Sequence, residues 1–298
     1  MNANPVFISA GGQKILKGFH LIFAAITLGG LLSMLALFGL KISNPDINQF
    51  PMDRSIYLIN NSVVYYSVMG NILTAMTYGL FTRWGFFKFD WVVVKWLLLI
   101  GLAVLFMMRF IPSVNGMTSL SDAGLNTAGA EAEYSDFVQR GLFWCVVLIG
   151  LFGAIFFIST IKPWGKRKED LVSNIRRLRI ILLSLTFLFL VFGIIGNINL
   201  NKLRKMPIEN SKLSNLPDGV YEGSFVGGGG TYKVKVYMKE EKMVQIESQN
   251  DRHSQYEKFA RPVLDRIIEN QNANVDGITG ATTTSKCIMK AVENALKH

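Results

Sequence analysis

Near its C-terminus the chain reads Asp276-Gly277-Ile278-Thr279-Gly280-Ala281-Thr282, which we call the DGITGAT segment. The two glycines of this segment permit a tight backbone turn. A short amphipathic helix is predicted directly after it, because apolar residues recur there at helical spacing. These apolar residues are Ile288, Val292, Ala295 and Leu296. The segment therefore marks the point at which a loop passes into a helix.

Four hydroxyl residues occupy the predicted first turn of that helix: Thr282, Thr283, Thr284 and Ser285. The first turn of a helix has free N–H groups and the positive end of the helix dipole, and both favour a phosphate. The residues by themselves thus indicate a phosphate cradle beside a choice of hydroxyl groups. A simpler interpretation is a turn followed by a threonine N-cap.

The DGITGAT segment resembles the Dxx[ST]GAT flavinylation signature of FMN-binding domains. These domains occur in the sodium-translocating NADH:quinone reductase, the Rnf complex and many bacterial extracytoplasmic electron-transfer proteins. The resemblance covers roughly residues 216–298, because LPDGVYEGSFVGGGGTYKVKVYMKEEKMVQIES is similar to the family's opening strands and glycine turn. It implies that a dedicated flavin transferase esterifies the phosphate of FMN onto Thr282.

The resemblance also implies roles for the neighbours of Thr282. Asp276 is expected to help the transferase recognise the segment or to position a divalent cation during transfer, and an Asp-Gly turn is compatible with both roles. Gly277 and Gly280 are expected to serve backbone geometry. Thr283 and Thr284 are chemically competent alternatives for the attachment. The predicted FMN site comprises Asp276, Gly277, Thr279, Gly280, Ala281, Thr282, Thr283, Thr284 and Ser285, with no catalytic or metal-binding residue.

Composition indicates a membrane protein. The chain of 298 residues is 50% hydrophobic, with a mean hydropathy of +0.30. Its net charge is +10, but the basic residues flank apolar segments, which favours a membrane topology signal over a nucleic-acid partner. Cys145 and Cys287 show neither metal-ligand nor disulfide spacing. The first apolar run lacks a cleavage pattern and is expected to remain as a membrane helix.

About five transmembrane helices are predicted, because five apolar stretches approach the length of about 20 residues that crosses a bilayer. They run approximately over residues 16–40, 63–82, 91–111, 141–161 and 178–198. In the second stretch Asn71, Thr74 and Tyr78 share one helical face, where we expect them to hydrogen-bond to neighbouring helices. The sequence therefore predicts a membrane α-helical bundle over residues 1–200.

The basic residues predict the orientation of this bundle. The connection between the fourth and fifth stretches is strongly basic, and its basic residues are Lys162, Lys166, Arg167, Lys168, Arg176, Arg177 and Arg179. By the positive-inside rule this connection is cytoplasmic. Alternation then places Lys14, Lys17, Arg83 and Lys88 inside as well. In a bacterial cytoplasmic membrane the N-terminus is thus expected in the cytoplasm, and everything after Leu200 outside it.

After a linker at residues 201–215, the pattern changes to a small α+β domain at residues 216–298. Strands are predicted at 220–226, 231–238 and 243–248, and a helix at about 254–270. The run Gly227–Gly230 joins two predicted strands and does not open a helix, so we interpret it as a turn near the flavin and not as a nucleotide loop.

His20 lies within the first apolar stretch, where an ionisable residue suggests a function such as binding quinone or haem. The other histidines, His253 and His298, belong to the C-terminal domain, so a bis-histidine haem within one bundle is excluded. A histidine–methionine haem, a haem shared across a dimer and a helix-pairing role stay open.

Together these features predict a membrane-anchored electron carrier. FMN on Thr282 would accept electrons from a membrane donor, either quinol or a redox partner subunit, and pass them to an extracytoplasmic acceptor. The expected partners are the flavin transferase, this donor and acceptor, and the lipid bilayer. One alternative is a redox sensor or assembly protein, in which the flavin domain reports to the bundle without net electron flux. Another is a transporter or simple anchor, with the exterior domain unmodified.

Overall fold

The computed structural model describes residues 8–44, 48–82, 85–86, 88–125, 129–165, 176–209, 216–249 and 254–297. Arg83, His253, His298 and the basic residues at 166–168 lie outside the described residues. The backbone divides into two units. The helical unit comprises Met1–Val114 and Ser135–Val191, and the C-terminal unit comprises Asn115–Tyr134 and Phe192–His298.

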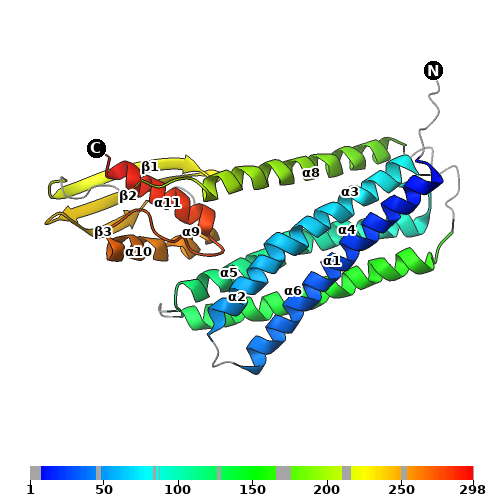
Figure 1. Cartoon of the computed structure of the whole chain (residues 1–298), viewed down its shortest axis with the longest axis horizontal. Helices are drawn as coiled ribbons and strands as arrows, with labels where there is room; N and C mark the ends of the chain where they lie inside the picture. Colours follow the sequence, from blue (N-terminus) through cyan, green and yellow to red (C-terminus); the bar gives the residue numbers. More distant parts are fainter. Residues whose placement is uncertain are drawn as a thin grey trace, which may run out of the picture. The chain divides into compact units, whose positions relative to one another are not determined.

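Helices make up the described N-terminal region (Figure 1). In chain order they are α1 (Ala10–Ser43), α2 (Gln49–Leu58), the π-helical η1 (Ile59–Val64), α3 (Tyr65–Phe81), α4 (Asp90–Leu105), the π-helical η2 (Phe106–Phe110), α5 (Ile111–Asp122), α6 (Ala130–Ile161) and α8 (Arg176–Arg204). Among the described residues, three helical runs are long and apolar enough to cross a membrane: Ala10–Ser43, Asp90–Asp122 and Ala130–Ile161. The second and fifth predicted stretches fall on α3 and α8, and the total of five spans stays a prediction.

The seam between α1 and the α2–η1–α3 run is joined by polar pairs seven or fourteen residues apart on α1, or about two or four helical turns. The opposing pairs are His20 with Thr74, Thr27 with Ser67, and Lys41 with Asp53. His20 Nδ1 lies 2.7 Å from Thr74 Oγ1, and Thr27 Oγ1 lies 2.8 Å from Ser67 Oγ. Lys41 and Asp53 form a buried ion pair. The two runs are therefore antiparallel and joined by polar contacts.

This seam confirms the predicted polar face of α3. Asn71 Nδ2 donates to Thr27 Oγ1, and the Tyr78 hydroxyl donates to the Gln13 carbonyl. The contact of His20 with Thr74 agrees with the helix-pairing interpretation of this histidine. Asn60 is fully buried, and within the described residues neither atom of its side-chain amide has a hydrogen-bond partner.

The C-terminal unit contains an antiparallel sheet of the order β1-β2-β3, formed by β1 (Gly219–Gly227), β2 (Gly230–Lys239) and β3 (Lys242–Ser248). These strands confirm the three predicted ones. On β2, Val234, Val236 and Met238 are buried, as the alternating pattern predicted. The helix α11 (Thr282–Ala295) packs on β1 and β2 (Figure 1). Gly223 permits this packing, since a Cβ there would collide with the backbone of α11.

The single helix predicted at 254–270 is wrong in one respect. Two helices occupy this region, α9 (Gln255–Ala260) and α10 (Pro262–Asn270). Pro262 has no backbone N–H and its ring clashes with the preceding turn, so it begins a new helix instead of continuing the old one. Of the apolar residues that helical spacing in 254–270 places inward, Phe259, Val263, Leu264 and Ile267 are buried and Ile268 is half-buried.

Candidate functional site

The DGITGAT segment connects α10 to α11 and is closed by a buried serine. Ser285 is 0% exposed; its hydroxyl accepts a hydrogen bond from the Ile278 N–H and donates to the Ala281 carbonyl, each over 3.1 Å. Gly277 faces this closure, because a Cβ there would lie 3.2 Å from Ser285 Cβ. Ser285 was predicted to bind the cofactor, and its hydroxyl group instead forms hydrogen bonds that stabilise the loop.

The first turn of α11 carries no side-chain cap. Its N-cap residue is Ala281, which has no hydroxyl to offer. The interpretation of this site as a threonine N-cap is therefore wrong. The N–H groups of the first turn have no partner within the helix, and a phosphate is a suitable acceptor for them. The structure thus presents an uncapped helix start where the sequence predicts a phosphate.

The hydroxyl groups of this turn differ in exposure. Thr284 and Ser285 are 8% and 0% exposed, whereas Thr282 and Thr283 are half-buried. Thr282 Oγ1 donates to the Ile278 carbonyl over 3.3 Å, and Thr283 Oγ1 accepts from Arg204 Nε over 3.1 Å. Thr282 and Thr283 are thus the two hydroxyl residues that solvent reaches.

Arg204 brings a positive charge to the first turn of α11. It is the last residue of α8, and Nη1 also donates to Asn201 Oδ1 over 3.4 Å. Within the described part of the chain, Arg204 forms no ion pair, so its charge is available to an anion. No sequence pattern predicted a role for this residue, because it lies in the predicted linker. The available signal was a basic residue at the end of the last apolar helix.

The glycine turn between β1 and β2 lies beside the same hydroxyl groups. Gly228 and Gly229 have positive φ values of +59° and +82°, which suit a two-residue hairpin. A Cβ on Gly228 would lie 3.6 Å from Thr283 Cγ2. Cys287 lies close by, fully buried, and burial raises the pKa of its thiol to about 11. The thiol is therefore neutral and unsuited to act as a nucleophile.

The last turns of α5 also contact the DGITGAT segment within the C-terminal unit. The Thr279 N–H donates to Asp122 Oδ2 over 2.6 Å, and Ser119 Oγ donates to the Thr279 carbonyl over 2.9 Å. Arg266 of α10 pairs with Asp122 and donates to the Asp276 carbonyl over 3.2 Å. The carboxylate of Asp276 itself belongs to an exposed residue. Sequence analysis missed Ser119, Asp122 and Arg266.

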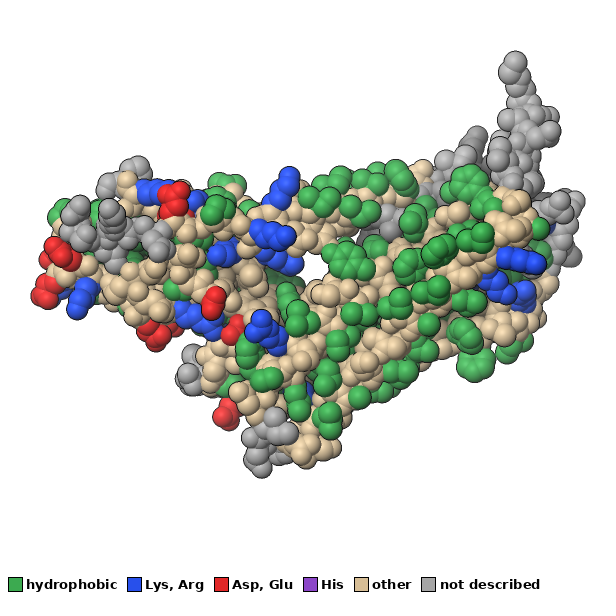
Figure 2. Space-filling view, viewed as in Figure 1, with side chains coloured by type: hydrophobic (Ala, Val, Ile, Leu, Met, Phe, Trp, Pro, Cys, Tyr) green, Lys and Arg blue, Asp and Glu red, His purple; other side chains and the backbone are tan. Residues whose placement is uncertain are grey.

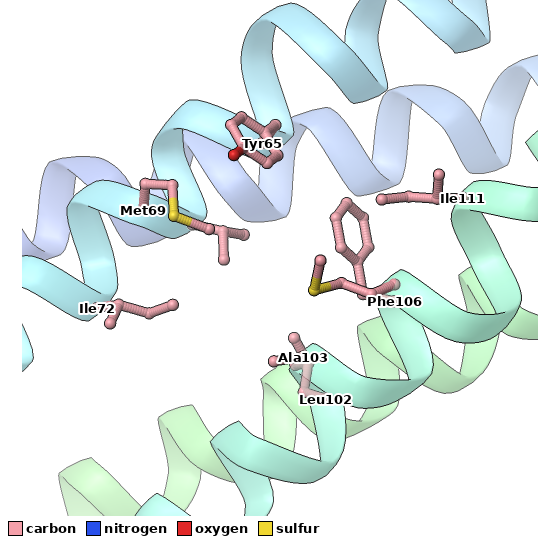
Figure 3. A pocket seen from close by; sticks show the side chains of 9 residues that line it. Tyr65, Met69, Ile72, Leu102, Ala103, Phe106 and Ile111 are labelled. Carbon is pink, nitrogen blue, oxygen red and sulfur yellow. The ribbon is translucent and has the colours of Figure 1, made fainter. Parts of the chain in front are cut away.

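The helical unit contains a small cavity between α3 and the α4–η2 run (Figure 3). It is lined by apolar side chains, including Ile72, Leu102 and Phe106, together with Tyr65. Its volume of about 20 Å³ suffices for about one water molecule. Among the residues that the structure describes, no cluster of three or more His, Cys, Asp or Glu side chains suits a metal ion. The C-terminal site is therefore the better candidate.

Comparison with protein families assigns a domain to this region. Residues 227–297 match the family model described as "FMN-binding domain". The match contains the glycine turn, the DGITGAT segment and α11. Searches of curated proteins and of solved structures found no match. Residues 227–297 therefore form a domain that matches the FMN-binding domain family, and an N-terminal region of apolar helices precedes it.

Proposed function

We propose that this protein is a membrane-anchored electron carrier whose FMN is linked through a phosphoester to Thr282. The observation that carries the proposal is the uncapped first turn of α11, which lies inside the matched domain and beside the charge of Arg204. When bound, the flavin supplies one- and two-electron redox chemistry. The protein contributes binding, orientation and electrostatic environment.

Thr282 is favoured over its neighbours by exposure and by hydrogen bonding. Thr284 and Ser285 are buried, and Ser285 is committed to closing the loop. The Thr283 hydroxyl accepts from Arg204, whereas Thr282 makes only a 3.3 Å bond to a carbonyl. In the transfer, the Thr282 oxygen attacks the flavin-side phosphorus of a flavin dinucleotide. The phosphoanhydride bond breaks, a mononucleotide leaves, and the hydroxyl proton passes to a base of the transferase.

Two groups of this chain would hold the resulting phosphate. The N–H groups at the start of α11 are directed at an anion by the helix geometry. The guanidinium of Arg204 contacts Thr283, the residue next to the attachment point, and can supply charge-assisted hydrogen bonds to the phosphate. A covalent link suits a carrier outside the cytoplasm, where dissociated FMN would not be replaced.

The topology of the proposal has five spans, a cytoplasmic N-terminus and an extracytoplasmic FMN-binding domain. It is supported by the strongly basic connection before α8 and by the positive-inside rule. The electron donor is a quinol or a redox subunit in the membrane, and the acceptor lies outside. Protease digestion of intact spheroplasts tests this topology: it is expected to cut residues 216–298, and digestion only in inverted vesicles would contradict it.

The attachment is tested by coexpression with a flavin transferase and by flavin fluorescence in denaturing gels. The wild-type band is expected to fluoresce and the Thr282→Ala band to be dark. Thr283→Ala is the matched control, since it removes the adjacent hydroxyl, and it should stay fluorescent. A fluorescent Thr282→Ala band, or a dark wild-type band, would contradict the assignment.

A further inference from the structure

Asp122 occupies a position that helix electrostatics disfavour. It is the last residue of α5, where the negative end of the helix dipole repels a carboxylate. Arg266 compensates for this, because its Nη2 donates to the Asp122 carbonyl over 2.8 Å and to Oδ1 over 3.0 Å. The second carboxylate oxygen, Oδ2, accepts from the Thr279 N–H over 2.6 Å. Arg266 thus orients the carboxylate toward the DGITGAT segment.

Ser119 and Asn115 complete this contact. Because Ser119 Oγ donates to the Thr279 carbonyl, α5 binds both backbone groups of Thr279. The next residue, Gly280, has φ +85°, and a Cβ there would lie 2.6 Å from both the Asn115 carbonyl oxygen and Ser119 Oγ. The need for glycine at position 280 therefore comes from its φ and from the close approach of α5.

The contact is shielded from water. Ser119 is 1% exposed, and the side chains of Asp122 and Arg266 are 12% and 26% exposed. Hydrogen bonds with a charged partner are among the stronger ones, and low exposure strengthens them further. The run Asp90–Asp122 is 33 residues long, or about 50 Å as a helix, against a hydrocarbon core of about 30 Å. The run is therefore longer than a helix must be to cross the hydrocarbon core.

We propose that Asn115–Asp122 forms part of the flavin site, with Asp122 as the positioning residue that holds the DGITGAT segment and the phosphoester on Thr282. This inference rests on the proposed function. It extends the site beyond residues 227–297, to the end of an apolar helix. The flavin is then held by the chain segment that leaves the membrane, as well as by its own domain.

The test uses the full chain in detergent, coexpressed with the transferase, and compares Asp122→Leu with Asp122→Asn. Leucine removes both acceptor oxygens, Oδ1 and Oδ2, whereas asparagine keeps an acceptor for the Thr279 N–H but loses the charge. Asp136→Leu and Asp136→Asn are the matched controls, because Asp136 is 48% exposed and its ion pair within the described residues is with Arg140. Two quantities are measured: hydrogen exchange of the Thr279 amide and iodide quenching of the attached flavin.

Asp122→Leu is expected to speed exchange at Thr279 about tenfold, and Asp122→Asn by a smaller factor, since a charge-assisted hydrogen bond is lost or weakened. Flavin quenching should rise in the same order, and the Asp136 variants should match the wild type. Faster exchange with unchanged quenching would overturn the positioning role, and so would unchanged exchange. If Asp122→Leu does not fold, Ser119→Ala replaces it. A wild-type chain without covalent flavin would instead refute the proposed function, while the exchange measurement still reports on the contact.

Discussion

The helical unit and the C-terminal unit place polar and apolar side chains in opposite ways. On the helices, large apolar side chains such as Leu97 and Phe157 are 64% and 65% exposed, while Lys41 and Asp53 are buried. In the C-terminal unit, Ile267 and Ile288 are buried, and charged side chains gather on the surface (Figure 2). The exposed apolar side chains of the helices suit a hydrocarbon solvent, and three of the described helical runs are long and apolar enough to cross a membrane, whereas the C-terminal unit suits water.

The largest expected change in the free energy of unfolding comes from the buried ion pair of the helical unit. Lys41→Met leaves Asp53 buried without its cation and should cost about 3–5 kcal/mol in the free energy of unfolding. The double variant Lys41→Met/Asp53→Leu should recover most of this loss. Unfolding in detergent can be followed by tryptophan fluorescence, because all five tryptophans lie in the helical unit.

Lys17→Met, also on α1 but at an exposed position, is the matched control and should be nearly neutral. A double variant as unstable as Lys41→Met would show that the unpaired charge of Asp53 is not the cause of the loss.

Removal of apolar side chains should affect the two units unequally. Ile288→Ala removes a fully buried side chain from the C-terminal core and should cost about 2–5 kcal/mol. Leu97→Ala, the corresponding change on the exposed surface of α4, should cost well under about 1 kcal/mol. Urea titration followed by flavin anisotropy measures the first and by tryptophan fluorescence the second. Equal losses of unfolding free energy in the two variants would contradict the difference between the two units.

A smaller effect is expected at Glu293, which is 0% exposed and accepts from Lys290 and Lys297 at 2.8 and 2.7 Å. Burial opposes its ionisation, but these hydrogen bonds prevail and hold the pKa of Glu293 below 4.5. Glu293→Gln should cost about 1–3 kcal/mol at neutral pH. Because the folded pKa is lowered, this stability is present above pH 4.5 and is lost as pH falls through the folded value.

The measurement is the difference in unfolding free energy between wild type and Glu293→Gln, taken from pH 7 downward. Glu269→Gln, an exposed change on α10, is the control and should show no such difference. A difference that is constant through acid pH would refute the role of the charge.

The smallest signal is expected from Cys287. Since burial raises the pKa of its thiol to about 11, roughly one molecule in a thousand is thiolate at pH 8. Maleimide labelling of the folded C-terminal unit should therefore be negligible and should appear on unfolding in urea. The measurement uses Cys145→Ser, so that Cys287 is the remaining thiol. Prompt labelling without urea would contradict the buried position.

Local sequence patterns predicted the helices and strands, but they did not predict the long-range contacts. Alternation of apolar residues located β2, and helical spacing located α11, because both signals lie within a few residues. The same periodicity ran through Pro262, where backbone chemistry breaks the helix. The polar face of α3 was predicted as well, because Asn71, Thr74 and Tyr78 share it.

The site was predicted only in part for the same reason. The DGITGAT segment and its hydroxyl residues are contiguous, so the sequence displays them together. Asp122 lies 157 residues before Thr279, and Arg204 lies 79 residues before Thr283. Their roles depend on contacts between the end of α5 and Thr279 and between the end of α8 and Thr283. The spacing of residues within one segment does not predict such contacts.

Mass spectrometry of the tryptic peptide Ile267–Lys286 from native membranes tests the central claim most directly. The account predicts a mass increase equal to FMN less one water, with fragment ions that place it on Thr282. An unmodified peptide, or fragments that place the increase on another hydroxyl residue, would contradict it.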